Sequence, residues 1–430
     1  MNEVLLARSQ MALSLGFHIV FATVGVAMPA LMSLAEWRWL KTKDADYLTL
    51  TKAWARGTTI LFAVGAVSGT VLSFELGLLF PGFMAHAGPL IGMPFSLEGF
   101  AFFTEAIFLG LYLYGWERLS PRLHLASGVI VALSGMASAG FVTLVNAWMN
   151  APRGFRLENG KMVDLDPLAA MSSSFAPHEI AHLLLAAYAA TGFAVAAVHA
   201  GLSLKRGASA FHSKALALAL MMGAPAALAQ LVVGDHAGKV VAEQQPMKLA
   251  AMEGLFKTEA HAPLHLGGVP DYDAHQTRYA IEIPSGLSIF AFNDPAATVK
   301  GLEEIPRADW PHPAVHYAFQ TMVGCGTLMA VVAGWALVLL IRRRPLEARR
   351  WFLRAVVACG PLGFVAIETG WMVTELGRQP WVVYGVIRTA ETVTPMPGLI
   401  VPFVLFGLVY LLLSATVARL LWRQFHQVAR

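Results

Sequence analysis

Long apolar stretches separated by short polar connections run through almost the whole chain. Nine of them reach the roughly 17–25 residues that an α-helix needs to cross the hydrocarbon core of a bilayer. Lipid offers backbone groups no hydrogen-bond partners, so each stretch is expected to be helical. The predicted spans are residues 11–34, 53–80, 95–114, 125–149, 178–204, 216–233, 315–341, 352–376 and 397–421. The pattern therefore predicts an all-α polytopic membrane protein with about nine transmembrane helices.

Composition and charge agree with this class and add an orientation. Of the 430 residues, 57% are hydrophobic and 13% are charged, against about 25% charged residues in soluble domains. Most Lys and Arg residues lie in the segments that follow the first, third, fifth, seventh and ninth spans. Because positively charged loops stay in the cytoplasm, this predicts a periplasmic N-terminus and a cytoplasmic C-terminus. The net charge of +4 is spread over short loops, which argues against a nucleic-acid partner. Cys325 and Cys359, both within predicted spans, exclude a disulfide framework and a cysteine-based metal site.

One polar segment is too long to be a simple connection. Residues 234–313 mix Pro, Gly, His and charged residues, and a segment of this length in a compact protein is usually functional. We divide the chain accordingly into a six-helix membrane part at 1–233, an outer loop at 234–313 and a three-helix membrane part at 314–430. The first apolar stretch has no small-residue cleavage site after it, so we expect a retained helix rather than a signal peptide.

The eighth span ends in an unusual way. Glu368 and Glu375 are seven residues apart and share one helix face. Gly377 and Pro380 then predict the end of the helix, with Arg378 beside Glu375. Ionisable groups inside a membrane span are costly, so they are a functional-site hypothesis by default.

Other spans carry polar groups at a similar predicted depth, in the outer half of the membrane. They are His18, Glu98, His178, His182, Met322, Glu368 and Glu375. Glu105 lies on the same helix face as Glu98, about 10 Å deeper in the membrane. We expect separate helices to bring these side chains into one shared buried site. His and Met are axial ligands of low-spin haem, and a buried Glu can bind haem iron or carry protons. Several haems in a helix bundle are therefore the leading hypothesis.

Two alternatives remain open at this point. The sequence HEIAH at 178–182 matches the H-E-x-x-H helix of zinc metalloproteases, which some intramembrane proteases place inside a span. A haem-free proton-coupled transporter would use the buried carboxylates as a proton relay instead. Haem absorption bands in a reduced-minus-oxidised spectrum would separate the haem-protein hypothesis from both alternatives.

Several motifs, in order along the chain, resemble subunit I of cytochrome bd-type quinol oxidases. They are LGFH ending at His18, the segment from Glu98 to Glu105, NAWM at 146–149, GDHAG at 234–238, QPMKLAAME at 245–253, MVG at 322–324 and GRQPW at 377–381. The resemblance covers most of the chain. It implies a haem-containing subunit of a terminal oxidase that oxidises quinol at the outer face and reduces O₂ to water. Cytoplasmic proton uptake would then generate membrane potential without pumping.

The resemblance also implies residue roles. His182 and Met322 would be the axial ligands of a low-spin haem b, and His18 and Glu375 would each ligate one of two high-spin haems. One of these two high-spin haems would be a second haem b, and the other, the third haem of the protein, would be of type d or b. Glu98, Arg378, Gln320 and Trp371 would lie near a haem or a haem propionate. A proton path would use Glu105, Glu98 and Ser138. Quinol would bind to Lys248, Glu253 and Asp235.

Two departures and a set of partners complete the expectations. Gln320 stands where well-known members carry Arg, which leaves a haem propionate less neutralised. The outer loop lacks a long insertion and looks like that of the short-loop, cyanide-insensitive branch. The implied partners are a homologous membrane subunit II, a small single-helix subunit in some members, quinol, O₂ and the lipid of the bacterial inner membrane.

Overall fold

The computed structural model describes residues 3–428, with side chains up to residue 424. Within this range nine helical stretches are long and apolar enough to cross a membrane, which confirms the predicted number of spans. They are α1 (Glu3–Thr42), α2 (Ala45–Leu79), α3 (Pro81–Tyr114), α4 (Pro121–Asn150), α6 (Ala176–Arg206), α7 (Ala210–Gln244), α10 (Ala314–Ile341), α11 (Arg350–Cys359) together with α12 (Leu362–Gly377), and α13 (Ile400–Val428). Residues 1–2 and 429–430, which our terminal segments include, lie outside the described residues.

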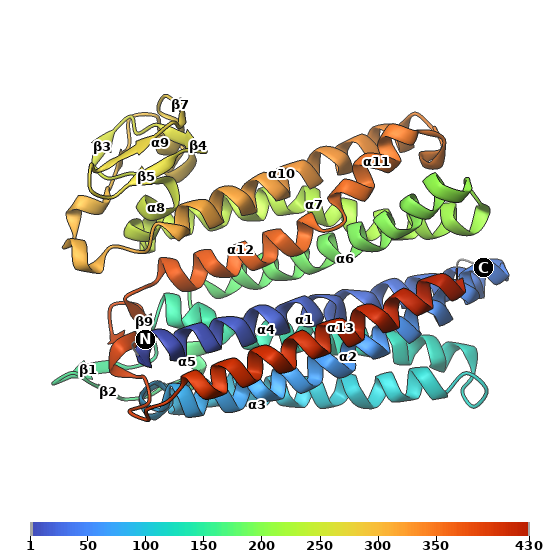
Figure 1. Ribbon diagram of the computed structural model, residues 1–430, viewed down its shortest axis with the longest axis horizontal. Helices are drawn as coiled ribbons and strands as arrows, with labels where there is room; N and C mark the ends of the chain where they lie inside the picture. Colours follow the sequence, from blue (N-terminus) through green and yellow to red (C-terminus); the bar gives the residue numbers. More distant parts are fainter. Residues whose placement is uncertain (1–2, 429–430) are drawn as a thin grey trace.

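The helices form two side-by-side groups (Figure 1). In one, α1 packs on α2 and α4, α3 packs on α4, and α13 lies against α1 and α2. In the other, α6 packs on α7 and α11, while α10 packs on α7 and α12. Contacts of α6 with α1 and α4 join the groups. A small core of Ile19, Ala190 and Ile367 marks this junction, with Trp371 packed against it.

Two helices extend well beyond the predicted spans. Helix α7 continues to Gln244, into the segment that we expected to form the outer loop, and α3 begins at Pro81 rather than residue 95. The 35 residues of α7 span about 52 Å, well beyond a hydrocarbon core of about 30 Å. The apolar pattern of a sequence reveals only the part of each helix that faces lipid, so it misses the polar ends of helices that extend beyond the membrane. As a consequence Glu98 lies near the middle of α3, not near its start as we expected.

A cap of short elements covers one end of the helices. It contains α8 (Pro246–Glu253), α9 (Gly286–Phe292) and the antiparallel pairs β3 (Glu259–Ala260) with β8 (Thr298–Val299), β4 (Leu264–Leu266) with β7 (Ile281–Ile283), and β5 (Val269–Asp271) with β6 (Gln276–Arg278). The cap lies at the end where α1 begins, and α13 finishes at the opposite end (Figure 1). Which end faces the cytoplasm stays a prediction.

Shorter elements complete the fold. They are β1 (Arg156–Glu158) with β2 (Lys161–Val163), β9 (Trp381–Val383) with β10 (Ile387–Arg388), α5 (Pro167–Met171), and the 3-10 turns η1 (Leu302–Glu304), η2 (Arg307–Asp309), η3 (Leu346–Ala348) and η4 (Thr389–Glu391). An apolar core beneath the cap, which includes Phe175, Leu249 and Val315, fixes α8 against α10.

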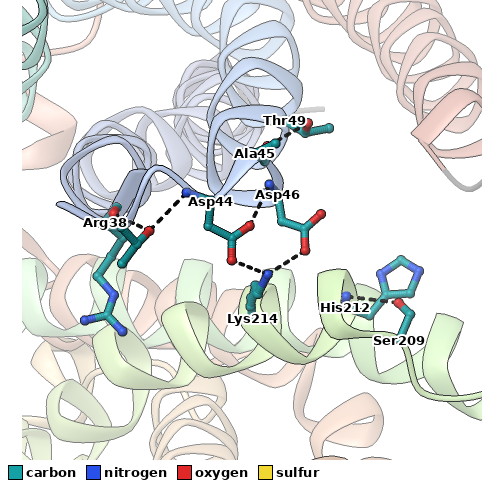
Figure 2. A network of polar contacts seen from close by, with 9 residues as sticks. Arg38, Asp44, Ala45, Asp46, Thr49, Ser209, His212 and Lys214 are labelled. Atoms are coloured by element: carbon teal, nitrogen blue, oxygen red, sulfur yellow. Dashed lines mark hydrogen bonds and ion pairs between the residues drawn. The ribbon is translucent and has the colours of Figure 1, made fainter. Parts of the chain in front are cut away.

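At the end away from the cap, an ion-pair network ties the two helix groups together (Figure 2). Lys214 of α7 donates to Asp46 at 2.6 Å and also to Asp44, and Asp44 caps the start of α2 by accepting from the Asp46 amide at 3.0 Å. These groups are partly exposed, so the network contributes modestly to stability and mainly sets how α2 meets α7.

Candidate functional site

A cavity of about 490 Å³ opens where the cap meets the helices. Its walls come from α4, α6, α7, α8, α10, α12 and strand β4. Most lining side chains are apolar, and a few polar groups converge on it, as in a binding site for a largely apolar ligand. The cavity brings together six of the predicted site residues, which are His182, Met322, Trp371, Lys248, Glu253 and Gln320, and Asp235 lies at its edge.

His182 and Met322 reach this cavity from α6 and α10. Nδ1 of His182 is buried without a hydrogen-bond partner, and Gln230 of α7 donates to the His182 carbonyl at 3.1 Å. A Cβ added at Gly370 would lie 3.1 Å from the Met322 sulfur, so glycine there makes room for the thioether. An unpartnered imidazole and a thioether on the walls of one apolar cavity fit a haem with His and Met axial ligands.

Arg378 and Glu375 lie beside the cavity, at the end of α12. Arg378 is 1% exposed, and its Nη2 donates to Glu375 Oε2 at 2.6 Å. Its Nε and Nη1 are buried and have no partner. Buried guanidinium donors without acceptors are costly. They fit the predicted position next to an anionic group such as a haem propionate. Asn146 of α4 donates to the other oxygen of Glu375 at 2.6 Å.

Asn150, at the end of α4, links the two sides of this network. It donates to Glu179 Oε1 at 3.1 Å and accepts from Lys248 Nζ at 2.7 Å. Gln245 also donates to the Asn150 carbonyl at 2.6 Å. The result is a continuous chain of polar contacts from Glu375 through Asn146 and Asn150 to Lys248. The sequence did not point to Asn150, and it pointed to Glu179 only as part of the HEIAH motif of the protease alternative.

Two ionisable side chains of α8 are buried in the wall of the cavity. Glu253 is 1% exposed and neither carboxylate oxygen has a partner. Burial raises the pKa of Glu253 to about 8, because removal from water disfavours the charged form. Burial also lowers the pKa of Lys248 to about 7, helped by nearby Arg378 and opposed by Glu179 and Glu375. Both side chains therefore exchange protons close to neutral pH, as expected of groups that handle protons.

Local structure explains where α8 places Glu253. The helix ends at this residue because Gly254 adopts the left-handed conformation, with φ of 67°. Thr277 of β6 donates to the Gly254 carbonyl at 2.7 Å. Glu253 is thus the last residue of α8, at the point where the chain leaves this helix for the strands of the cap.

Gln320 and Asp235 have different surroundings. The Gln320 amide donates to the His265 carbonyl at 2.9 Å and accepts from the Gly267 amide at 3.1 Å, so it binds the cap to α10. Asp235 is exposed and forms an ion pair with Lys239 at 2.6 Å on the same helix. Asp235 also lines the cavity, with its carboxylate already paired with Lys239, and its contact with quinol stays a prediction.

A second polar group lies between α3 and α4. Ser138 donates to Glu98 Oε1 at 3.1 Å. Glu105 is 5% exposed, and a Cβ added at Gly135 of α4 would lie 3.2 Å from its carboxylate. The three residues predicted for a proton path therefore lie along one helix–helix interface.

His18 and Glu368 belong to the junction of the two helix groups. The His18 ring lies 3.0 Å from Ser68 Oγ of α2. A Cβ added at Gly16 would lie 3.1 Å from Glu368 Oε2, so α1 approaches α12 closely here. Trp371 both lines the cavity and packs against this junction. The contacts of the described residues bring His18 close to α2 and α12, but they do not join it directly to Glu98 or Glu375.

The zinc-protease reading of residues 178–182 finds no third ligand. Over the side chains that are described, no three His, Cys, Asp or Glu residues converge in a group that could hold a metal ion. Glu179, the glutamate of this motif, accepts a hydrogen bond from Asn150. His178 has the His236 ring as a neighbour, at 6.2 Å between centroids.

Comparison with known proteins gives one consistent result. The family described as cytochrome bd terminal oxidase subunit I matches residues 6–429. A Bacillus subtilis (strain 168) protein, provisionally named a cytochrome bd menaquinol oxidase subunit I, is 37% identical and covers 99% of this chain and 97% of its own length. The cytochrome bd ubiquinol oxidase subunit 1 of the same strain is 31% identical, over 99% of this chain and 94% of its own length. The solved bd oxidase from Geobacillus thermodenitrificans has a chain of 43% identity and TM-score 0.93, covering 99% of both chains.

Proposed function

Since this chain belongs to the cytochrome bd terminal oxidase subunit I family, we propose that quinol is oxidised at its cavity, next to a low-spin haem. Family membership makes the protein a multi-pass component of the bacterial inner membrane and part of a quinol:O₂ oxidoreductase with a second subunit. The names of the relatives divide between menaquinol and ubiquinol, so the proposal commits to a quinol and not to one species.

One observation supports this proposal most strongly. The candidate axial ligands His182 and Met322 line the same cavity as the buried ionisable side chains Lys248 and Glu253. Quinol oxidation needs an electron acceptor and a proton acceptor within reach of one bound molecule, and the cavity walls provide both. A haem b bound by His182 and Met322 would supply the electron acceptor. Glu253 would accept a proton, and Lys248 would hydrogen-bond a quinol oxygen.

The oxygen-reducing site is proposed on the far side of Trp371. His18 and Glu375 would each hold one of two further haems, one of type b and the other of type d or b, with Glu98 beside them. Trp371 supports this arrangement because it touches both the cavity and the α1–α12 junction. Arg378 would hold a propionate through its two free donors.

Protons for oxygen reduction are proposed to come from the cytoplasm along α3 and α4. Glu105, Ser138 and Glu98 form successive polar positions on that interface. If the cap faces the periplasm, quinol protons leave on one side while protons are consumed from the other. Membrane potential then arises without a pump.

A direct test uses the purified two-subunit oxidase without oxygen. Addition of a short-chain quinol is expected to produce the absorption bands of reduced haem b, and oxygen should then reverse them. A protein whose spectrum does not respond to quinol, although a chemical reductant does reduce it, would overturn the proposed quinol site.

A further inference from the structure

His265 is a buried histidine that enters the cavity from the cap. It is 7% exposed, lies on β4 and lines the cavity. Its Nδ1 lies 2.8 Å from the backbone carbonyl of Glu253. A carbonyl oxygen only accepts hydrogen bonds, so Nδ1 must carry the proton. The neutral ring therefore has its lone pair on Nε2, which makes Nε2 the atom able to receive a proton.

A route to solvent begins at this nitrogen. Strand β4 pairs with β7 so that His265 stands opposite Glu282. Nε2 of His265 lies 3.8 Å from Glu282 Oε1, and the Glu282 side chain is 61% exposed. The carboxylate would stabilise a protonated imidazole and pass its proton to water.

Of the other titratable groups around His265, two are already hydrogen-bonded and one has no partner at all. His316 of α10 has its two ring nitrogens 2.9 Å and 3.1 Å from the carbonyls of Met252 and Gly267. Lys248 donates to Asn150. Glu253 has no hydrogen-bond partner through which a proton could leave. His265 is thus the base beside Glu253 that also has a connection to solvent.

We propose that His265 is the second proton acceptor of quinol oxidation and that Glu282 is its outlet; this rests on the proposed function of the cavity. Quinol loses two electrons and two protons as it becomes quinone. The two electrons would go one at a time to the haem that His182 and Met322 would hold, and ultimately to O₂. One O–H proton goes to the Glu253 carboxylate and the other to His265 Nε2, from which it passes by Glu282 to the solvent. Once His265 is neutral again, the proton held by Glu253 follows through the same histidine to Glu282.

The test compares His265→Asn with the wild-type oxidase. Asparagine can keep the donor to the Glu253 carbonyl through its side-chain amide, but it has no titratable base at the Nε2 position. We expect kcat with quinol to fall about ten- to a hundredfold, with KM changed less than twofold. The acid limb of log kcat against pH should lose one unit of slope, because one required deprotonation is gone.

Two further variants keep the test decisive. Glu282→Gln removes the proposed proton outlet beside His265 Nε2, so quinol-dependent kcat should fall about tenfold while haem content stays normal. His261→Asn changes an exposed histidine of the same cap and should leave both rate and pH profile unaltered. Wild-type kcat and slope in His265→Asn, or wild-type kcat in Glu282→Gln when the asparagine variant does not fold, would overturn the proposal. If Glu253→Ala is also fully active with quinol, the proposed function itself fails, whereas a normal His265→Asn beside an inactive Glu253→Ala rejects only the role of His265.

Discussion

Replacing Glu253 with Ala is expected to lower quinol-dependent oxygen consumption by about a hundredfold or more. The carboxylate is buried in the cavity, has no hydrogen-bond partner and has its pKa raised to about 8. Loss of a positioned general base typically costs 10² to 10⁴ in rate. Oxygen consumption supported by an artificial donor that bypasses the cap should stay near the wild-type rate.

The raised pKa of Glu253 adds a pH dependence with a definite sign. Only the ionised carboxylate can accept a proton, and with a pKa of about 8 roughly a tenth of the molecules carry it at pH 7. Quinol-dependent kcat should therefore rise as pH increases from 7 to 9. Glu253→Gln keeps the shape of the side chain and should abolish this rise.

A control and a contradicting result are available within the same cap. Glu259 is an exposed glutamate on β3, and Glu259→Gln should have wild-type activity. Equal loss of activity with quinol and with the artificial donor in Glu253→Ala would show that the substitution damages the haem sites, and Glu253 would not be the quinol base.

Replacing Glu105 with Leu is expected to slow oxygen reduction by about ten- to a hundredfold while haem content stays normal. Leucine occupies a similar volume in the α3–α4 interface but cannot carry a proton. Glu105 is 5% exposed and lies against Gly135, close to the Ser138–Glu98 pair. Oxygen consumption and haem absorbance should be measured on the same preparation, because a folding defect would lower both.

The exposed Glu117, which follows α3, provides the matched control for this variant. Glu117→Leu should leave oxygen reduction unchanged. Full activity of Glu105→Leu would mean that protons reach the oxygen site by another route, and the α3–α4 path would have to be abandoned.

The sequence was most informative where one local feature decides the structure. The end of α12 follows from Gly377 and Pro380, and Arg378 pairs with Glu375 as its spacing suggested. The number of spans could also be predicted from the sequence, because a run of about 20 apolar residues seldom forms anything other than a membrane-spanning helix. The roles given to His182 and Met322 came from residue chemistry and from family resemblance together, and the structure places both on one cavity.

Other parts depend on contacts between distant segments and could not be read locally. Nothing near residue 265 indicates that the β4–β7 pair carries His265 into a cavity formed mostly by helices. Asn150 gains its importance only because Glu179 and Lys248, far apart in sequence, meet it. The polar end of α7 was assigned to the loop, since helix outside the membrane has no sustained apolar signal.

The central claim is that side chains from α6 and α10 hold a low-spin haem in the cavity below the cap. Leucine matches methionine closely in volume but has no sulfur to donate, so Met322→Leu isolates the proposed bond. The decisive measurement is the optical and magnetic circular dichroism spectrum of the reduced variant oxidase. The account predicts that the low-spin haem b signature is replaced by a high-spin one with haem content retained. A low-spin signature identical to that of the wild type would contradict it.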